Sequence, residues 1–380
     1  MPDSSEPNGQ PQAGCPLSPE VLPPQFRKHV DPEGRKPMRM MAAKALIPMP
    51  PAEQVKALFI LTFDPEEDVR EAANAAAANL PDSIMAPVLR GELPCEVLDF
   101  MARRLTEKPQ YLELILLNSR TSDETFAHLA GAVDEKLLSI IADNQLRLLR
   151  HEGIIRAIHE NPRASAALLD KVVDFAVRSG VNIPDLPSFQ EARRRILGEE
   201  AAEASLPAEQ TAEGLLEAHS GELAEEFEDE EIDEEEMEDR RQTLAQKVLV
   251  MTVSEKVKLA TLGNKEARTL LLRDPNKLVQ AAAAQSPRIT EGEVVGLTNS
   301  RTIPDEVMRI VLSNRDWMKN YQIKVNLVNN PKTPLPTALR LLPHMRPSEL
   351  RSLSRNRNVP TALATQAKNL IEKKSGGRGA

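Results

Sequence analysis

The sequence predicts an all-α protein in which a disordered acidic linker joins two α-solenoid modules. Three observations lead to this prediction. A short phrase rich in Asn, Pro and Thr recurs along the chain, apolar residues follow it at helical spacing, and an acidic run separates two stretches of similar pattern. Stacked helix pairs form solenoids because one short pair cannot bury its own apolar face.

The phrase at Asn330 shows the logic of the repeat. Asn tolerates the left-handed backbone expected just past a helix end, and Pro331 cannot continue that helix. We expect the Thr333 hydroxyl to cap the next helix, and Pro334 suits the first helical position. Apolar side chains then recur at i, i+3, i+4 and i+7, which predicts one buried helix face. They are Leu335, Ala338, Leu339 and Leu342.

Near-copies of the phrase mark other turns between helices. They begin at Asn118, Asn161, Asn299 and Asn358. In the C-terminal part, the copies at 299, 330 and 358 are separated by 31 and 28 residues, which leaves room for two short helices in each interval. One such pair is predicted at Pro304–Ser313 and Trp317–Val328.

Helix starts are predicted from capping residues. Thr followed three residues later by an acid indicates a capping box at Thr121–Glu124, Thr290–Glu293 and Thr302–Asp305. Asp followed by Pro, as at Asp64 and Asp274, indicates an Asp cap with Pro at the first helical position. No sustained alternation of apolar and polar residues predicts a strand.

A longer echo indicates an internal duplication. The stretch "DPEEDVREAANAAAANL" from Asp64 resembles "DPNKLVQAAAAQSP" from Asp274, and "PCEVLDFM" from Pro94 resembles "PDEVMRIV" from Pro304, both at an offset of 210 residues. We infer that one helical-repeat module was duplicated, with the acidic run between the copies.

These motifs resemble a known superfamily. The pattern "DPxxxV…A" followed by "NPxTPxxxL" resembles the HEAT/ARM-like repeat families of bacteria, most nearly the leucine-rich repeat variant, over residues 38–176 and 245–371. The resemblance implies an α-solenoid. One architecture of that variant carries a cysteine cluster for an iron–sulfur centre, which this chain lacks, so we expect no cofactor.

The predicted organisation has five segments. They are a disordered Pro-rich leader (1–37), a first helical-repeat module (38–198), an acidic disordered linker (199–239), a second, basic module (240–374) and a disordered tail (375–380). The linker carries 19 acidic and no basic residues, whereas residues 240–380 carry 25 basic and 10 acidic ones. Like-charge repulsion extends such a linker. It serves either as a solvating spacer or as a tethered mimic of nucleic acid that masks the basic module.

Composition predicts a cytoplasmic protein without catalytic chemistry. The two cysteines, Cys15 and Cys95, lie far apart, no apolar run is long enough to span a membrane, and the first residues lack the basic and apolar regions of a secretory signal. The six histidines are scattered without a metal-ligand spacing, and no nucleophile or phosphate-loop motif is found. We therefore expect no enzyme.

The basic module holds the candidate binding residues. Cations at its turns and helix starts would line one edge of a solenoid. They are Arg301, Arg315, Lys319, Lys332, Arg346, Arg351, Arg355 and Arg357. This stripe fits an acidic protein partner, nucleic acid phosphates, or only a solubilising face with cations at helix C-termini.

One aromatic pair completes the list of candidates. Trp317 and Tyr321 are four residues apart on one predicted helix, where they pack between repeats or form an exposed anchor for a partner. The sequence thus favours a scaffold or adaptor for protein–protein interaction. The alternative is a nucleic-acid-associated protein whose basic module is masked by the acidic linker.

Overall fold

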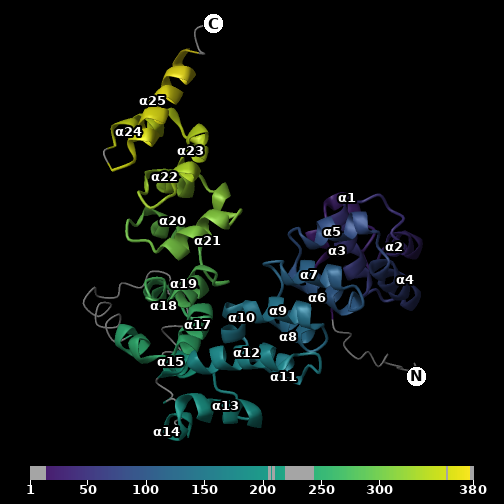
Figure 1. Cartoon of the computed structure of the whole chain (residues 1–380). Coiled ribbons are helices and arrows are strands. Elements are labelled where there is room, and N and C mark those ends of the chain that lie inside the picture. Colours follow the sequence, from purple (N-terminus) through teal and green to yellow (C-terminus); the bar gives the residue numbers. More distant parts are fainter. Residues whose placement is uncertain (1–13, 204–206, 208–209, 219–243, 357, 377–380) are drawn as a thin grey trace, which may run out of the picture. The chain divides into compact units, whose positions relative to one another are not determined.

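The computed structural model describes residues 14–203, 207, 210–218, 244–356 and 358–376, and the regular elements of these residues are helices throughout, as the sequence predicts (Figure 1). The contacts divide the chain into two compact units, Met1–Val173 and Asp174–Ala380, and the division falls inside one helix. In the described part, no helix combines the length and the apolar character needed to cross a membrane.

Unit 1 contains short helices that contact others close in sequence. In one series α3, α5, α7 and α9 contact one another in turn, and in a second series α4, α6, α8 and α11 do so. The elements are η1 (Pro19–Val21), α1 (Pro24–Arg27), α2 (Lys36–Ala43), α3 (Pro51–Leu61), α4 (Glu67–Ala78), α5 (Asp82–Leu89), α6 (Cys95–Arg104), α7 (Pro109–Leu116), α8 (Asp123–Ala130), α9 (Glu135–Asp143), α10 (Gln145–Arg150), α11 (Glu152–Glu160) and α12 (Ala166–Arg178), which continues into unit 2.

Unit 2 follows the same plan. α17, α19 and α21 contact one another in turn, as do α20, α22, α23 and α25, and α24 packs on α25 (Figure 1). Its elements include α13 (Pro187–Leu197), α14 (Glu199–Glu203), α15 (Ala212–Ala218), α17 (Val253–Leu262), α18 (Lys265–Leu271), α19 (Lys277–Ala284), α20 (Glu291–Asn299), α21 (Asp305–Ser313), η3 (Trp317–Lys319), α22 (Tyr321–Asn329), α23 (Leu335–Leu341), η4 (Leu342–His344), α24 (Pro347–Arg355) and α25 (Thr361–Gly376).

Buried asparagines explain why the short phrase recurs. The Nδ2 of Asn118 donates to the carbonyls of residues 89 and 91 (2.7 and 2.9 Å). The Nδ2 of Asn161 donates to the carbonyls of residues 130 and 133 (2.7 and 3.0 Å). The Nδ2 of Asn330 donates to the carbonyls of residues 298 and 300 (2.8 and 3.0 Å). Each Oδ1 accepts the N–H two residues on. The amide therefore satisfies carbonyls at an earlier helix end, about 30 residues back in each case.

The backbone at these asparagines differs from the expectation. Asn161 (φ −75°, ψ 116°) and Asn330 (φ −83°, ψ 121°) are extended, and the left-handed conformation predicted for Asn330 is wrong. The physical reason is the hydrogen bond from the N–H two residues on to the Asn Oδ1, which forms a turn through the side chain. From this extended backbone the amide group also reaches the earlier helix end.

Of the capping predictions, one is confirmed and two are replaced by contacts of buried threonines. The box at Thr290 is present in full, with Glu293 N–H on the Thr290 hydroxyl (3.3 Å) and Thr290 N–H on the Glu293 carboxylate (2.7 Å). The hydroxyls of Thr121 and Thr333 instead face the protein interior, on the Ile115 carbonyl (2.6 Å) and the Met308 sulfur (3.9 Å). Buried threonines thus support packing between helices rather than a cap.

Two further predicted caps are replaced by neighbouring residues. Ser122, not Thr121, caps α8, and its hydroxyl accepts the Thr125 N–H (3.2 Å). α21 begins at Asp305 after Pro304, without a side-chain cap, so the box predicted at Thr302 is wrong. Each shift is small because a proline or a second hydroxyl next to the threonine offers an equivalent helix start.

The duplicated segments share a hydrogen-bonding pattern. The carboxylates of Asp64 and Asp274 each accept the N–H two residues on (2.9 and 2.8 Å). Their carbonyls accept a side chain six residues on, Arg70 at 2.8 Å and Gln280 at 2.6 Å. Both aspartates therefore shape the turn before the helix, and the helices α4 and α19 begin three residues later instead of directly after the aspartate.

The expected leader is ordered over its described part. Residues 14–37 contain η1, α1 and the start of α2, and Leu22 (1% exposed) and Val30 (2%) are buried. Arg27 Nε also donates to the Leu22 carbonyl (2.8 Å). The proline content predicted disorder, but the apolar residues between the prolines bury enough surface to order this segment. Residues 1–13 lie outside the described part.

The expected linker is also helical in part. α14 and α15 fall within residues 199–239, and Ala212 and Leu215 of α15 are fully buried. The Ala212 N–H donates to the Glu255 carboxylate of α17 (2.8 Å), so α15 is anchored on a helix of the predicted basic module. Residues 219–239 of the predicted linker and 377–380 of the predicted tail lie outside the described part, and α25 continues to Gly376.

Gly180 places the end of α12 against the start of α17. Its φ is +89°, and an added Cβ would lie 2.4 Å from the Cβ of Thr252, the residue that caps α17. The nearby Ser254 N–H donates to the Ser179 carbonyl (2.9 Å). This close approach explains why the compact unit begins at Asp174 rather than at the predicted residue 240.

We expect Gly180→Ala to destabilise unit 2 strongly. The positive φ costs about 1–2 kcal/mol in any residue with a Cβ, and the clash with Thr252 adds roughly 2 kcal/mol. Urea denaturation followed by circular dichroism measures the loss. The control is Gly198→Ala, because Gly198 has φ +86° but nothing within 4 Å of its added Cβ. Equal losses in the two variants would contradict the close approach.

Candidate partner-binding surface

The helix α24 presents a polar, basic face. Pro347 occupies the first helical position, and Leu350 and Leu353 are buried on one side of the helix (0% and 1% exposed). The opposite side carries polar residues at i, i+3, i+4 and i+7, a spacing that keeps them on one helix face. They are Ser348, Arg351, Ser352 and Arg355.

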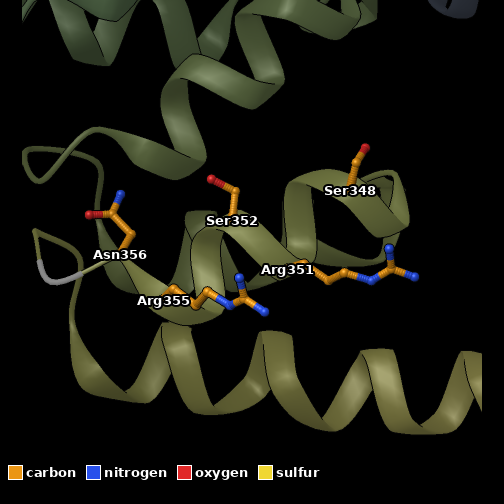
Figure 2. Close-up of a pocket in the computed structure, with 5 residues that line it drawn as sticks. All are labelled: Ser348, Arg351, Ser352, Arg355 and Asn356. Carbon is orange, nitrogen blue, oxygen red and sulfur yellow. The ribbon is translucent and has the colours of Figure 1, made fainter.

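This face borders a shallow hollow of ≈ 630 Å³. The lining residues are Ser348, Arg351, Ser352, Arg355 and Asn356. Figure 2 shows the two guanidinium groups on the same side of α24, with the side chains of Ser352 and Asn356 directed away from them. Asn356 ends the helix, and its Oδ1 accepts the Asn358 N–H (2.9 Å). Its Nδ2 donates to Asn329 Oδ1 (3.3 Å), which links α24 to the turn after α22.

The hollow is lined by hydrogen-bond donors. Two guanidiniums supply up to ten N–H groups between them, and two hydroxyls and an amide supply more. Arg351 and Arg355 are exposed, and neither guanidinium has a hydrogen-bond or ion-pair partner among the described residues. No carboxylate lines the hollow. Its chemistry therefore favours an anion.

The predicted basic stripe divides between two edges of unit 2. On the first edge, Asn330 Nδ2 donates to the Ser300 carbonyl (3.0 Å), which joins the turn after α22 to the turn after α20. Asn356 Nδ2 donates to Asn329 Oδ1, which joins the turn after α24 to the turn after α22. These three turns therefore lie in a row. These turns and helix ends carry Arg301, Lys332 and Arg355. Arg357 lies outside the described residues.

The second edge carries a different set. Asn320 Nδ2 donates to Glu291 Oε1 (2.8 Å), and the Arg346 N–H donates to the Tyr321 hydroxyl (2.9 Å), which places the starts of α20, α22 and α24 together. The turns on this edge carry Arg315, Lys319 and Arg346. The six cations placed by these contacts therefore do not form the single row that the sequence suggested. Alternate turns of a helical array point to opposite edges, and these six cations come from both sets.

Two of the predicted cations, both lysines, form ion pairs or hydrogen bonds within unit 2. Lys319 Nζ lies 2.6 Å from Asp316 Oδ1. Lys332 Nζ donates to the Ile303 carbonyl (2.8 Å) and lies 3.6 Å from Asp305. Lys332 thereby stabilises the turn of the preceding repeat, as does Arg163 in unit 1, which donates to the Ala132 carbonyl (2.8 Å). This is the structural role that cations near carbonyl-rich helix ends were expected to have.

The aromatic pair does not share a helix. Trp317 lies in η3, and Tyr321 begins α22 after Asn320, whose Oδ1 caps α22 by accepting from Gln322 N–H (2.7 Å). The continuous helix predicted from Trp317 is thus broken by an asparagine cap. The Arg346 guanidinium lies 4.7 Å from the centre of the Tyr321 ring, so this ring is already covered within the unit.

Arg301, Arg315, Arg351 and Arg355 remain as exposed cations without a described partner. Arg351 and Arg355 line one hollow together. The sequence reading included both but missed Ser348, Ser352 and Asn356. The spacing S-x-x-R-S-x-x-R after Pro347 would have indicated that the serines share the arginine face.

In the part of the chain that the structure describes, no three His, Cys, Asp or Glu side chains are placed to hold a metal ion. His128 lies on α8 near Asp99 and Arg103, and burial, followed by the charge of Arg103, lowers its pKa.

No protein-family model, curated protein or solved structure matches the chain. The geometry of the α24 hollow is therefore the basis for the function proposed below.

Proposed function

We propose that each unit is an α-solenoid of HEAT-like repeats, nearest to the leucine-rich repeat variant. Two observations support this architecture. Helices contact others close to them in sequence, and buried asparagines connect turns about 30 residues apart in both units. Such an array exposes a long surface relative to its core, which suits it to binding other macromolecules.

We propose further that the protein is a non-enzymatic scaffold or adaptor that binds an acidic segment of a protein partner through unit 2. The observation that carries this proposal is the pair of exposed, unpartnered arginines, Arg351 and Arg355, in a hollow lined by donors. The lining of the hollow offers no carboxylate or imidazole that would serve as a catalytic base.

The alternative is a nucleic-acid-associated protein whose acidic segment masks the basic module. One observation favours it: α15, which precedes the 13 carboxylates of residues 222–239, is anchored on α17 of the basic module. A local anion at such an effective concentration would compete with nucleic acid. Against it, the described cations lie on two edges rather than in the continuous row that a phosphate backbone favours.

One binding experiment separates the two proposals. A labelled peptide rich in Glu and a short DNA duplex are titrated into the full chain, and into a variant whose residues 222–239 are replaced by Gly and Ser. We expect the peptide to bind to the wild-type chain and to dissociate several-fold more readily when salt rises from ~50 to ~200 mM. Absence of peptide binding at low salt would refute the scaffold proposal.

The duplex tests the alternative. If the acidic segment masks a nucleic-acid site, its replacement raises duplex affinity and steepens the dependence on salt, because more phosphates are then contacted. If duplex affinity and its salt dependence are the same in both chains, the masking proposal fails.

A further inference from the structure

We propose that the hollow on α24 binds a phosphorylated serine or threonine side chain of the protein partner. This inference rests on the function proposed above and names the group that unit 2 would recognise. It depends on the position of Arg351 and Arg355 side by side in one hollow and on the separation of the other basic residues of unit 2.

The charge of the hollow matches a phosphate monoester. Arg351 and Arg355 are one helical turn apart on the exposed face of α24. A phosphate monoester carries a charge between about −1.5 and −2 at neutral pH, which nearly neutralises the two positive charges of Arg351 and Arg355. One carboxylate would neutralise only one of them. Guanidiniums bind phosphate oxygens in a bidentate geometry, which a lysine cannot do.

The number of N–H donors on the two arginines favours the same ligand. Ser348, Ser352 and Asn356 also line the hollow, but Ser352 and Asn356 are directed away from the guanidiniums (Figure 2), and the Asn356 amide already bonds to Asn329. A phosphate has three terminal oxygens, each with more than one acceptor site, so it accepts from both guanidiniums. A carboxylate has two oxygens and leaves more of the guanidinium donors without a partner.

The helix that carries the hollow is held in place by the interior of unit 2. Leu350 and Leu353 are buried, and α24 packs along α25. Asn356 bonds to Asn329 in the turn after α22 (3.3 Å). The backbone positions of the two arginines are therefore set before a ligand arrives, so only their side chains lose freedom on binding.

The rest of unit 2 favours an isolated phosphate group over a nucleic acid strand. A strand presents a row of single charges, which requires cations along its path. Lys319 and Lys332 are paired with aspartates, and Arg301 and Arg315 lie at turns on opposite edges. Tyr321, a ring on which a base would stack, is already covered by Arg346.

The experiment uses three labelled peptides that differ at one central residue, which is phosphoserine, serine or glutamate. Their binding to the full chain is measured by fluorescence anisotropy. We expect the phosphoserine peptide to bind about 10-fold more tightly than the glutamate peptide, because a dianion engages both arginines. The double variant R351Q/R355Q should lose this preference, while its circular dichroism stays unchanged because both side chains are exposed.

The matched control is R301Q/R315Q. It removes the same charge from unit 2 and also changes exposed arginines without a described partner, but at sites outside the hollow. This variant should bind the phosphoserine peptide within about twofold of the wild-type chain. Equal losses in the two double variants would overturn the proposal, since net charge alone would then explain binding.

Two further outcomes would overturn it. Equal affinity for the phosphoserine and glutamate peptides would show that the hollow does not recognise phosphate, and binding of the Glu-rich peptide would then leave the scaffold function standing. Inorganic phosphate that competes as strongly as the phosphopeptide would identify a site for the free ion. If neither the phosphopeptide nor the Glu-rich peptide binds, both this inference and the proposed function fail.

Discussion

Asn161→Asp is expected to lower the free energy of unfolding of unit 1 by about 3 kcal/mol or more. The Nδ2 of Asn161 donates to the carbonyls of Ala130 and Val133 at 2.7 and 3.0 Å, and the residue is 4% exposed. An aspartate has no N–H at that position, so its carboxylate would face two buried carbonyl oxygens. The substitution removes two hydrogen bonds and adds repulsion at nearly constant volume.

The matched control for this prediction is Asn144→Asp in the same unit. Asn144 caps α10, and its Oδ1 accepts the Arg147 N–H (3.4 Å). An aspartate preserves that acceptor and is as good an N-cap, so we expect a change below about 0.5 kcal/mol. Urea denaturation measures both variants. Similar losses for the two would show that the buried amide does not connect the repeats.

Arg268→Met is the second large effect, and we expect it to cost unit 2 about 3–5 kcal/mol at neutral pH. Arg268 (1% exposed) donates to both carboxylate oxygens of Glu293 (2.9 and 3.0 Å) and to the Gly263 carbonyl (2.9 Å). Methionine fills much of the same space but leaves the Glu293 carboxylate buried without its cation. The control is Arg309→Met, because the pair of Arg309 with Glu306 is at the surface and contributes little.

The loss in Arg268→Met should shrink as the pH falls. Burial alone would raise the pKa of Glu293, but hydrogen bonds from Arg268 and Thr290 outweigh it and hold this pKa below its ordinary value of 4.5. The stability that the pair contributes is therefore present above pH 4.5 and is lost as the pH falls through the lowered pKa. A destabilisation that stays constant on acidification would contradict a charged Glu293 as its cause.

Variants of the buried framework of unit 2 must be distinguished from variants of the hollow when binding data are interpreted. A variant such as Asn330→Asp would disturb the turns on the first edge of unit 2 and displace the hollow indirectly. By contrast, Arg351 and Arg355 make no described contact that stabilises the fold. A binding defect in R351Q/R355Q with normal unfolding would thus report on recognition itself.

Local chemistry predicted most of the secondary structure. The helical spacing of apolar residues gave helices where α21 and α23 are found, and Thr290 with Glu293 gave a capping box that is present in full. These features depend on residues within one helical turn of each other, and a sequence displays such neighbours directly. The offset of 210 residues likewise corresponds to matching hydrogen bonds at Asp64 and Asp274.

The sequence by itself therefore determined that the chain is helical, where several of its turns fall, and that its charge is divided between an acidic run and a basic module. Only the tertiary structure decided that Arg301 and Arg315 lie on opposite edges, that Leu22 orders part of the leader, and that Arg351 and Arg355 remain unpartnered while Lys319 and Lys332 are paired. The reason is physical: helix formation depends on near neighbours, whereas burial and pairing depend on which distant turns the stacking of helices brings together.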